Sequence, residues 1–164
     1  MFYSYVDSPV GRLLLAGSRH ALKILAFSRG SRARDVEAEW ERAEEPFRRV
    51  KRQLDEYFDG ERRRFDLALA PDGTDFQRAV WQALVAIPYG ETRSYRAIAD
   101  QIGHPRAIRA VGAANGANPI AIILPCHRVI GSDGSLIGFG GGLDTKRYLL
   151  DLERSHSGLF AERR

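Results

Sequence analysis

The sequence predicts an α+β protein in which an antiparallel sheet with one packed helix is followed by a mostly helical part that contains a helix-turn-helix. Three observations support this prediction. Period-2 apolar runs fill the first third of the chain, helical spacing dominates after residue 74, and a glycine turn joins two short helices within that second part. The 164 residues, 44% of them hydrophobic, suffice for one domain or two small ones.

Three strands are predicted near the N-terminus, over residues 2–6, 13–16 and 22–27. Apolar and polar residues alternate in these runs, and turn residues such as Ser8-Pro9-Val10-Gly11 separate them at the spacing of hairpins. Neighbouring strands are therefore expected to pair antiparallel.

One helix is expected to pack on this sheet. Apolar residues recur at helical spacing after Pro46, and the run stops at Asp59-Gly60, where glycine can form a left-handed C-terminal cap. The apolar positions are Phe47, Val50, Leu54 and Phe58.

Residues 62–69 are expected to add another strand, and the sequence Ala-Pro-Asp-Gly at 70–73 is typical of a turn and of a linker. The predicted domains are accordingly 1–73 and 74–155. A frayed tail is expected over 156–164.

The second part opens with a helix. Thr74 and Gln77 have the spacing of a capping box, and apolar residues follow at helical spacing from Phe76 to Ile87 until Pro88 stops the run. The capping pair and the proline together predict both ends of this helix.

Two shorter helices follow in the helix-turn-helix pattern. Ser94 can cap the first, which is expected to end at Ile102 and Gly103. Pro105 suits the first position of the second helix, which is expected to run to about Gly116. Because any small helical protein has such corners, the pattern alone leaves DNA binding and a purely structural corner open.

Positive charge is concentrated near this pattern. The chain has a net charge of +4, and residues 93–128 carry five arginines and one acid, which reproduces the whole surplus. Arg106 and Arg109 are three residues apart and are expected to share one face of the second helix. A polyanion would be drawn to this region, although a merely soluble basic face has the same composition.

Membrane insertion and export are not expected. The longest apolar run covers only residues 120–125, and residues 1–5 lack the basic-then-apolar order of a signal peptide. We therefore expect a cytoplasmic protein without a membrane partner.

The last part of the chain combines a buried segment, a glycine loop and a helix. The apolar run 120–124 is expected to be covered on both sides. The loop 138–142 lacks the spacing of a nucleotide-phosphate cradle, but its glycines let a ligand approach the backbone closely. Asp144 can cap a final helix that ends near Glu153 or Arg154.

Cys126 is the only cysteine of the chain. A single cysteine excludes an intrachain disulfide and a multi-cysteine metal site, so it is either a buried apolar residue or a working thiol. His127 and Arg128 follow it, and a cation or a histidine base raises the thiolate fraction above the roughly 3% of a free thiol at neutral pH. We expect an ionised thiol at the rim of a pocket, joined to His127 by a water.

A histidine base usually has a carboxylate partner, and Glu153 is the best candidate. It lies four residues after Leu149 and three after Leu150, which places it on the apolar face of the last helix. A buried carboxylate there would need a basic partner. The alternative is a glutamate at an exposed helix end.

These residues together resemble the O6-alkylguanine-DNA alkyltransferases, also called methylated-DNA-protein-cysteine methyltransferases. The similarity covers about half the chain in the family's order, and the N-terminal third resembles the family's more variable sheet-and-helix domain. The matching segments are 76–81, Pro88-Tyr89-Gly90, Ser94-Tyr95, Arg109-Ala110-Val111-Gly112, Asn118-Pro119, 125–129, Gly141-Gly142-Leu143 and Leu149-Leu150 with Glu153.

The resemblance implies a ribonuclease H-like N-terminal domain, a winged helix-turn-helix in the C-terminal domain, and DNA repair by a single-use protein. The Cys126 thiolate would take the alkyl group from O6-alkylguanine and keep it as a thioether, with O4-alkylthymine as an open second substrate. No cofactor and no metal are expected. The implied partner is double-stranded DNA whose damaged base is flipped out on the minor-groove side, bound by a monomer.

The resemblance also assigns roles to residues. Those acting on the thiol or the departing guanine are Cys126, His127, Glu153, Tyr95, Asn118 and Lys146. Those facing DNA are Ser94, Arg106, Arg109, Ala110 and Arg128, with Arg109 as the finger that enters the base stack. Those of the substrate pocket are Val129, Phe139, Gly140 and Gly141, with the carbonyls of Cys126 and Val129 accepting the guanine amino group.

Two positions depart from the family pattern. Many members carry tyrosine where this chain has Phe139, and serine or alanine where it has Gly140. These differences put one hydrogen bond to the guanine oxygen in doubt and suggest a roomier alkyl pocket.

Two other functions stay open. One is a lesion-binding protein without chemistry, although such relatives replace the cysteine, and the other is a cysteine hydrolase that uses Cys126 and His127 over many turnovers.

Overall fold

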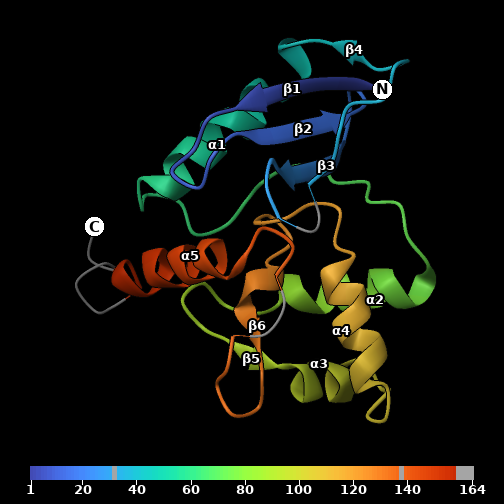
Figure 1. Cartoon of the computed structure of the whole chain (residues 1–164), viewed down its shortest axis with the longest axis vertical. Helices are drawn as coiled ribbons and strands as arrows, with labels where there is room; N and C mark the ends of the chain where they lie inside the picture. Colours follow the sequence, from blue (N-terminus) through green and yellow to red (C-terminus); the bar gives the residue numbers. More distant parts are fainter. Residues whose placement is uncertain (31–32, 137–138, 158–164) are drawn as a thin grey trace.

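The computed structural model describes residues 1–30, 33–136 and 139–157. Figure 1 shows an N-terminal sheet with one helix beside it, and a group of helices below it that forms the second part of the molecule. This mixed α+β architecture agrees with the sequence prediction.

The strands are β1 (Phe2–Val6), β2 (Leu13–Gly17), β3 (Leu22–Phe27), β4 (Glu41–Arg42), β5 (Arg93–Ser94) and β6 (Val129–Ile130). The α-helices are α1 (Arg48–Phe58), α2 (Asp75–Val85), α3 (Tyr95–Gln101), α4 (Ile108–Gly116) and α5 (Leu143–Ser155), and the 3-10 helices are η1 (Glu45–Phe47) and η2 (Cys126–Arg128).

The N-terminal sheet has the order β3-β2-β1-β4. The three long strands pair antiparallel, as their alternating pattern predicts. Strand β4 pairs parallel with β1 through Phe2↔Glu41 and Tyr3↔Arg42. It is not predictable from the sequence, because two exposed residues carry no periodic pattern. The short strands β5 and β6 form a separate parallel pair.

The strand expected over residues 62–69 does not form. Only an isolated bridge joins Leu69 to Leu22 at the edge of the sheet. The Gln53 side chain of α1 instead bonds the backbone of Asp66, accepting from its N at 2.9 Å and donating to its O at 3.1 Å. A side-chain amide therefore satisfies groups that a neighbouring strand would otherwise bind.

Helix α1 packs on the sheet and ends as predicted. Gly60 adopts a φ of +78° and its N–H bonds the carbonyl of Tyr57, a left-handed cap. The buried face contains Val50, Leu54 and the fully buried Tyr57, whereas Phe58 of the predicted stripe is half-buried. At 3.6 residues per turn, positions 57 and 58 both lie near the face of position 54. The spacing alone therefore does not show which of the two is the buried one.

The helices of the second part begin largely where their caps predict. Thr74 and Gln77 form the reciprocal capping box of α2, and Ser94 accepts from Ala97 N at 3.0 Å at the start of α3. Helix α4 begins at Ile108 and not at Pro105, because residues 104–107 close a turn of their own. Arg106 consequently lies before the helix and does not share a helical face with Arg109.

Helix α5 begins at Leu143, directly after Gly142 with a φ of +92°, so Asp144 occupies the first turn and is not the cap. Its carboxylate there still interacts favourably with the positive end of the helix dipole. Of the tail expected to fray, residues 156–157 are attached, because Arg63 donates to His156 O at 2.6 Å. Residues 158–164, and Gly138 of the predicted glycine loop, lie outside the described residues.

One hydrophobic core joins the two parts of the chain. It runs from the inner face of the sheet through α1 and α2 to the segment 120–124, which is buried throughout as predicted. Backbone hydrogen bonds cross the same boundary, from Leu25 N to Pro119 O at 2.9 Å and from Ala121 N to Leu25 O at 3.0 Å.

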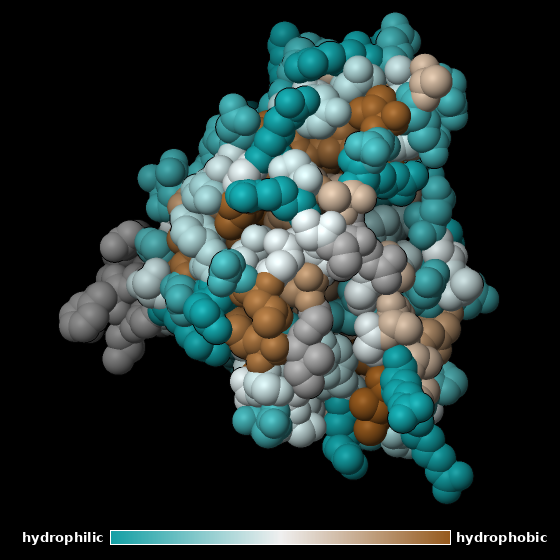
Figure 2. Space-filling view, viewed as in Figure 1, coloured by the Kyte–Doolittle hydropathy of each residue, from teal (hydrophilic) through white to brown (hydrophobic). Residues whose placement is uncertain are grey.

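Hydrophilic residues cover most of the face in Figure 2, with hydrophobic ones in separate patches. Within the described ranges, every helix is too short or too polar to cross a membrane.

Candidate active site

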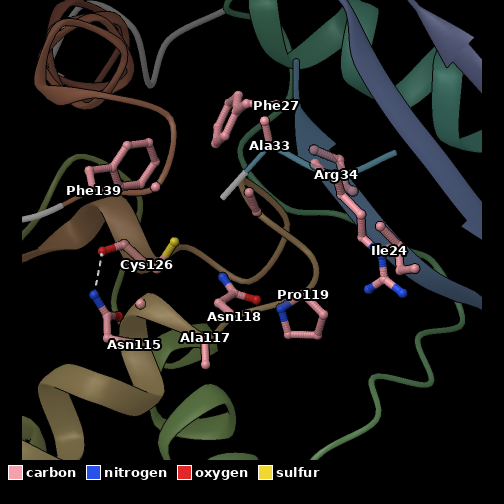
Figure 3. Close-up of a pocket in the computed structure, with 15 residues that line it drawn as sticks. Ile24, Phe27, Ala33, Arg34, Asn115, Ala117, Asn118, Pro119, Cys126 and Phe139 are labelled. Carbon is pink, nitrogen blue, oxygen red and sulfur yellow. Dashed lines mark hydrogen bonds between the residues drawn. The ribbon is translucent and has the colours of Figure 1, made fainter. Parts of the chain in front are cut away.

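Cys126 opens onto a cavity of about 300 Å³ between the two parts of the molecule. Helix η2 carries the cysteine directly after the buried segment 120–124, and its sulfur points toward Asn118 and the cavity beneath Phe139 (Figure 3). Across the cavity lie Phe27 at the end of β3 and Arg34 in the loop that follows it. The side chain is 6% exposed, so the thiol is accessible through this cavity and buried elsewhere.

Behind Cys126, His127 and Glu153 form a buried pair. Nε2 of His127 lies 2.6 Å from Oε2 of Glu153, and both side chains are almost completely inaccessible. An imidazole that donates from Nε2 to this carboxylate leaves Nδ1 as the acceptor. Nδ1 is buried and has no hydrogen-bond partner among the described residues, so it is available to accept a proton. The predicted glutamate partner is thus inside the protein and not at an exposed helix end.

Arg128 supplies the second basic partner of Glu153. Its Nε donates to Oε1 at 2.8 Å and its Nη2 to Oε2 at 3.1 Å, while Nη1 donates to Ile87 O at 2.8 Å. The side chain is buried, and each of its three guanidinium nitrogens donates a hydrogen bond. The expectation that Arg128 faces DNA is therefore wrong in this structure, because the carboxylate of Glu153 holds it in the interior. Part of the basic surplus of residues 93–128 is consequently internal.

Burial sets the protonation states of the thiol and the imidazole. Desolvation raises the pKa of Cys126 despite the nearby Asn118 and Lys146 side chains, and it lowers the pKa of His127 despite Glu153. Burial would also raise the pKa of Glu153, but His127 and Arg128 hold that pKa well below its usual range. The expectation of an ionised thiol is therefore wrong, because these shifts favour a neutral thiol, a neutral imidazole and a charged Glu153 carboxylate at neutral pH.

Acid is expected to destabilise this protein in two stages. The pKa of His127 lies below its ordinary 6.5 and that of Glu153 below its ordinary 4.5, so the unfolded chain binds protons that the folded chain does not. The free energy of unfolding should fall below pH 6.5 and again below pH 4.5, by up to about 1.4 kcal/mol per pH unit for each group. Urea unfolding between pH 7 and 3.5 measures this. His127→Gln should lack the first stage, and a flat profile from pH 7 to 5 in the unaltered protein would contradict it.

Three further residues predicted for the site lie around Cys126. Asn118 holds the segment before the cysteine, donating to Leu124 O at 2.7 Å and accepting from Ile120 N at 2.9 Å. Lys146 of α5 is fully buried and donates to Val129 O at 2.6 Å. Burial raises the pKa of Tyr95, with a further rise from Cys126, so its hydroxyl keeps its proton at neutral pH.

The residues expected to face DNA, apart from Arg128, lie on the helix-turn-helix. Arg106, Arg109 and Ala110 are exposed around the start of α4. Ser94 is half-buried, and its hydroxyl is used as the cap of α3. Only the first three therefore present free surface for a ligand.

Of the residues expected to form the substrate pocket, Phe139 and Gly140 line the cavity, whereas Val129 and Gly141 lie outside its lining. Phe139 packs on Phe27 with ring centroids 5.5 Å apart, and both line the cavity with Gly140. A Cβ on Gly141 would lie 2.6 Å from the Phe27 ring, so this position requires glycine. The side chain of Val129 is fully buried, and its carbonyl accepts from Lys146.

Several residues of the site are not predicted from the sequence, and three of them contact its functional groups or face the thiol across the cavity. Tyr57 reaches Glu153 from α1, Asn115 donates to Cys126 O at 3.3 Å, and Arg34 lines the cavity from the N-terminal part. The helical spacing of Val50, Leu54 and Tyr57 could have indicated the first. Nothing in the local pattern indicates the other two, because their partners are brought near by the fold.

The described ranges contain no group of three or more side chains that could hold a metal ion. The side chains of the site place a thiol in a cavity and a histidine–carboxylate pair behind it.

A cysteine nucleophile beside a helix-turn-helix defines the class: a protein that brings a reactive thiol to a nucleic acid. Two family models match this chain, "6-O-methylguanine DNA methyltransferase, ribonuclease-like domain" over residues 1–71 and "6-O-methylguanine DNA methyltransferase, DNA binding domain" over residues 75–155. The chain belongs to the methylated-DNA–protein-cysteine methyltransferase family.

Relatives match along nearly the whole chain. A methylated-DNA–protein-cysteine methyltransferase of Methanosarcina barkeri is 55% identical over 156 residues, which is 95% of this chain and 99% of that protein. One from Mycobacterium tuberculosis is 52% identical over 155 residues, 94% of this chain and 93% of that protein. The crystal structure of Mycobacterium tuberculosis OGT in complex with DNA matches with a TM-score of 0.89, 52% identity and 94% coverage of each chain.

Proposed function

We propose that this protein repairs DNA by transferring the alkyl group of O6-alkylguanine to Cys126, once per molecule and irreversibly. The observation that carries the proposal is the free thiol of Cys126 in a cavity, backed by the buried His127–Glu153 pair. The names of its relatives, and the DNA bound to the Mycobacterium tuberculosis structure, support the same reaction. O4-alkylthymine is a further candidate substrate.

In the proposed step, the Cys126 sulfur forms a bond to the alkyl carbon while the bond from that carbon to guanine O6 breaks. The thiol proton passes through a water to Nδ1 of His127, a buried acceptor that has no hydrogen-bond partner among the described residues, and Glu153 stabilises the imidazolium that results. Tyr95 is protonated and can supply a proton to the departing guanine. Transfer of the thiol proton during the reaction explains how a thiol with a raised pKa can act as the nucleophile.

The DNA surface is proposed to be the exposed start of α4. Arg109 would enter the base stack where the damaged nucleotide leaves it, with Arg106 and Ala110 beside it, and Ser94 near the backbone. The flipped guanine would enter the cavity from this side, with its amino group on the carbonyls of Cys126 and Val129. The Val129 carbonyl accepts from Lys146 and has a second lone pair for this amino group. The Cys126 carbonyl already accepts from Val129 N and from Asn115 Nδ2 at 3.3 Å, so the guanine would have to displace the longer bond from Asn115.

Several finer proposals go with this function. Asn118 and Lys146 would fix the segments that carry the thiol and the base-binding carbonyl. The absence of a hydroxyl on Phe139 and of a side chain on Gly140 would admit larger alkyl groups. The protein would work as a monomer in the cytoplasm, with residues 1–73 and 74–155 as its two domains.

Mass spectrometry of the intact protein tests the function. Incubation with an O6-methylguanine duplex should add one methyl mass to the peptide that contains Cys126, and the reaction should stop after one equivalent. Cys126→Ser is the control and should gain no mass. Continued turnover without a lasting mass gain would indicate a hydrolase, and lesion binding without a mass gain would indicate a sensor; either result would reject the proposal.

A further inference from the structure

Tyr57 connects the N-terminal part of the chain to the proton-accepting pair of the active site. Its hydroxyl donates to Oε2 of Glu153 at 2.6 Å, and its side chain is fully buried. Helix α1 holds the ring among three aromatic neighbours. These neighbours are Phe58, Phe65 and Tyr89. Burial and the adjacent carboxylate raise the pKa of Tyr57 well above its ordinary value, so the hydroxyl always acts as a donor.

This hydroxyl binds the same oxygen as His127. Oε2 of Glu153 receives Tyr57 at 2.6 Å, Nε2 of His127 at 2.6 Å and Nη2 of Arg128 at 3.1 Å, whereas Oε1 receives Nε of Arg128 and the backbone N of Gly90. A carboxylate oxygen that accepts a hydrogen bond from one donor is a weaker acceptor for the next. Tyr57 and His127 therefore compete for the same negative charge.

We propose that Tyr57 is a positioning residue through which the N-terminal part of the protein limits how strongly Glu153 stabilises the protonated form of His127. The inference rests on the proposed proton transfer from Cys126 to His127 and adds a residue that touches neither the thiol nor the substrate. Arg128 and Gly90 hold Glu153 in place without the hydroxyl. Loss of the hydroxyl should therefore change the electrostatics of the pair with little movement of the carboxylate.

The charged and titratable groups around the pair belong to several elements. Glu153 is faced by Tyr57 from α1, Tyr89 from the loop after α2, and His127 and Arg128 from η2. His127 is additionally affected by Lys146 from α5. Of these, Tyr57 and Tyr89 both carry a buried hydroxyl, but Tyr89 Oη has no hydrogen-bond partner among the described residues. Tyr89→Phe is therefore a matched control for Tyr57→Phe.

The test compares the two variants with the unaltered protein by two measurements that require no DNA. One is the titration of the His127 ring followed by NMR. The other is the pH dependence of Cys126 alkylation by iodoacetamide, which reports on one site because the chain has a single cysteine. In Tyr57→Phe, the His127 midpoint should rise by about 0.5 to 1 pH unit, because the imidazolium gains a stronger acceptor. The Cys126 midpoint should move down, with roughly 3- to 10-fold faster alkylation at pH 7.

Tyr89→Phe should leave both midpoints within about 0.2 pH unit of the unaltered protein, since its hydroxyl bonds nothing among the described residues. Unchanged midpoints in Tyr57→Phe, even with a lower melting temperature, would overturn the proposal and leave Tyr57 with a purely structural role. A fall in the His127 midpoint would also overturn it. Failure of the DNA reaction is seen separately, by mass spectrometry of the unaltered protein.

Biosynthetic replacement of all tyrosines by 3-fluorotyrosine tests the same effect without removing the hydroxyl. A fluorinated phenol is a stronger hydrogen-bond donor, so the His127 midpoint should move down in the fluorinated protein, opposite to its shift in Tyr57→Phe. Fluorination of Tyr57→Phe should cause no such shift. An equal shift in both backgrounds would assign the effect to another tyrosine and reject the proposal.

Discussion

Glu153→Ala is expected to destabilise the protein by about 3–5 kcal/mol, the range observed when one partner of a buried ion pair is removed. Arg128 would keep its positive charge in the interior, and Tyr57 and His127 would each lose an acceptor at 2.6 Å. Urea unfolding at pH 7 measures the change. Glu91→Ala is the control: it breaks an exposed ion pair with Arg93 and should cost less than about 1 kcal/mol. Equal losses in the two variants would show that burial does not determine the effect.

The same variant should also be a poor alkyl acceptor. Without the carboxylate, the imidazolium form of His127 loses its stabilising partner, and the pKa of His127 falls further below its ordinary value. The imidazole then takes the thiol proton less readily, and Cys126 should react more slowly with an O6-methylguanine duplex at every pH. An undiminished rate in folded Glu153→Ala would exclude Glu153 from the proton transfer.

Asn118→Ala is expected to cost about 2–3 kcal/mol, because it removes two hydrogen bonds that brace the segment before Cys126. The pKa of the Cys126 thiol should rise further, since Asn118 lowers it in the unaltered protein. Urea unfolding and the pH dependence of iodoacetamide labelling measure the two effects.

Asn118→Asp separates these two contributions. Aspartate keeps the acceptor for Ile120 N but sets a carboxylate oxygen against the Leu124 carbonyl oxygen in place of the donor, so its loss of stability should be at least as large as that of the alanine variant. Its negative charge should raise the pKa of the thiol more than alanine does. A thiol that titrates alike in both variants would show that Asn118 acts only as a brace.

Much of the fold is predictable from the sequence because it follows local patterns. The period-2 runs predict β1 to β3, and the capping pair at Thr74 and Gln77 predicts the start of α2. The errors lie where a partner distant in the sequence decides the structure. Gln53 binds the backbone of Asp66 in place of a strand, and β4 has only two exposed residues that pair with β1.

The central residues of the candidate site are also predictable from local patterns. Cys126, His127 and Glu153 are found by residue type and by position on a helix face, and the structure brings all three together. The position of Arg128 is not predictable, since a sequence shows its charge but not the carboxylate that binds it in the interior. The ionisation of the thiol is not predictable either, because the cost of removing water from the sulfur depends on the complete fold.

The cavity beside the sulfur is lined by residues from distant parts of the chain. The residues that determine which group fits the cavity are therefore separate from those that transfer the proton. Residues of β3 such as Ile24 and Phe27 shape the space for the incoming group but take no part in handling protons. Natural or laboratory selection can thus retune which adducts fit by altering the N-terminal strands, while the chemistry encoded near the C-terminus stays intact.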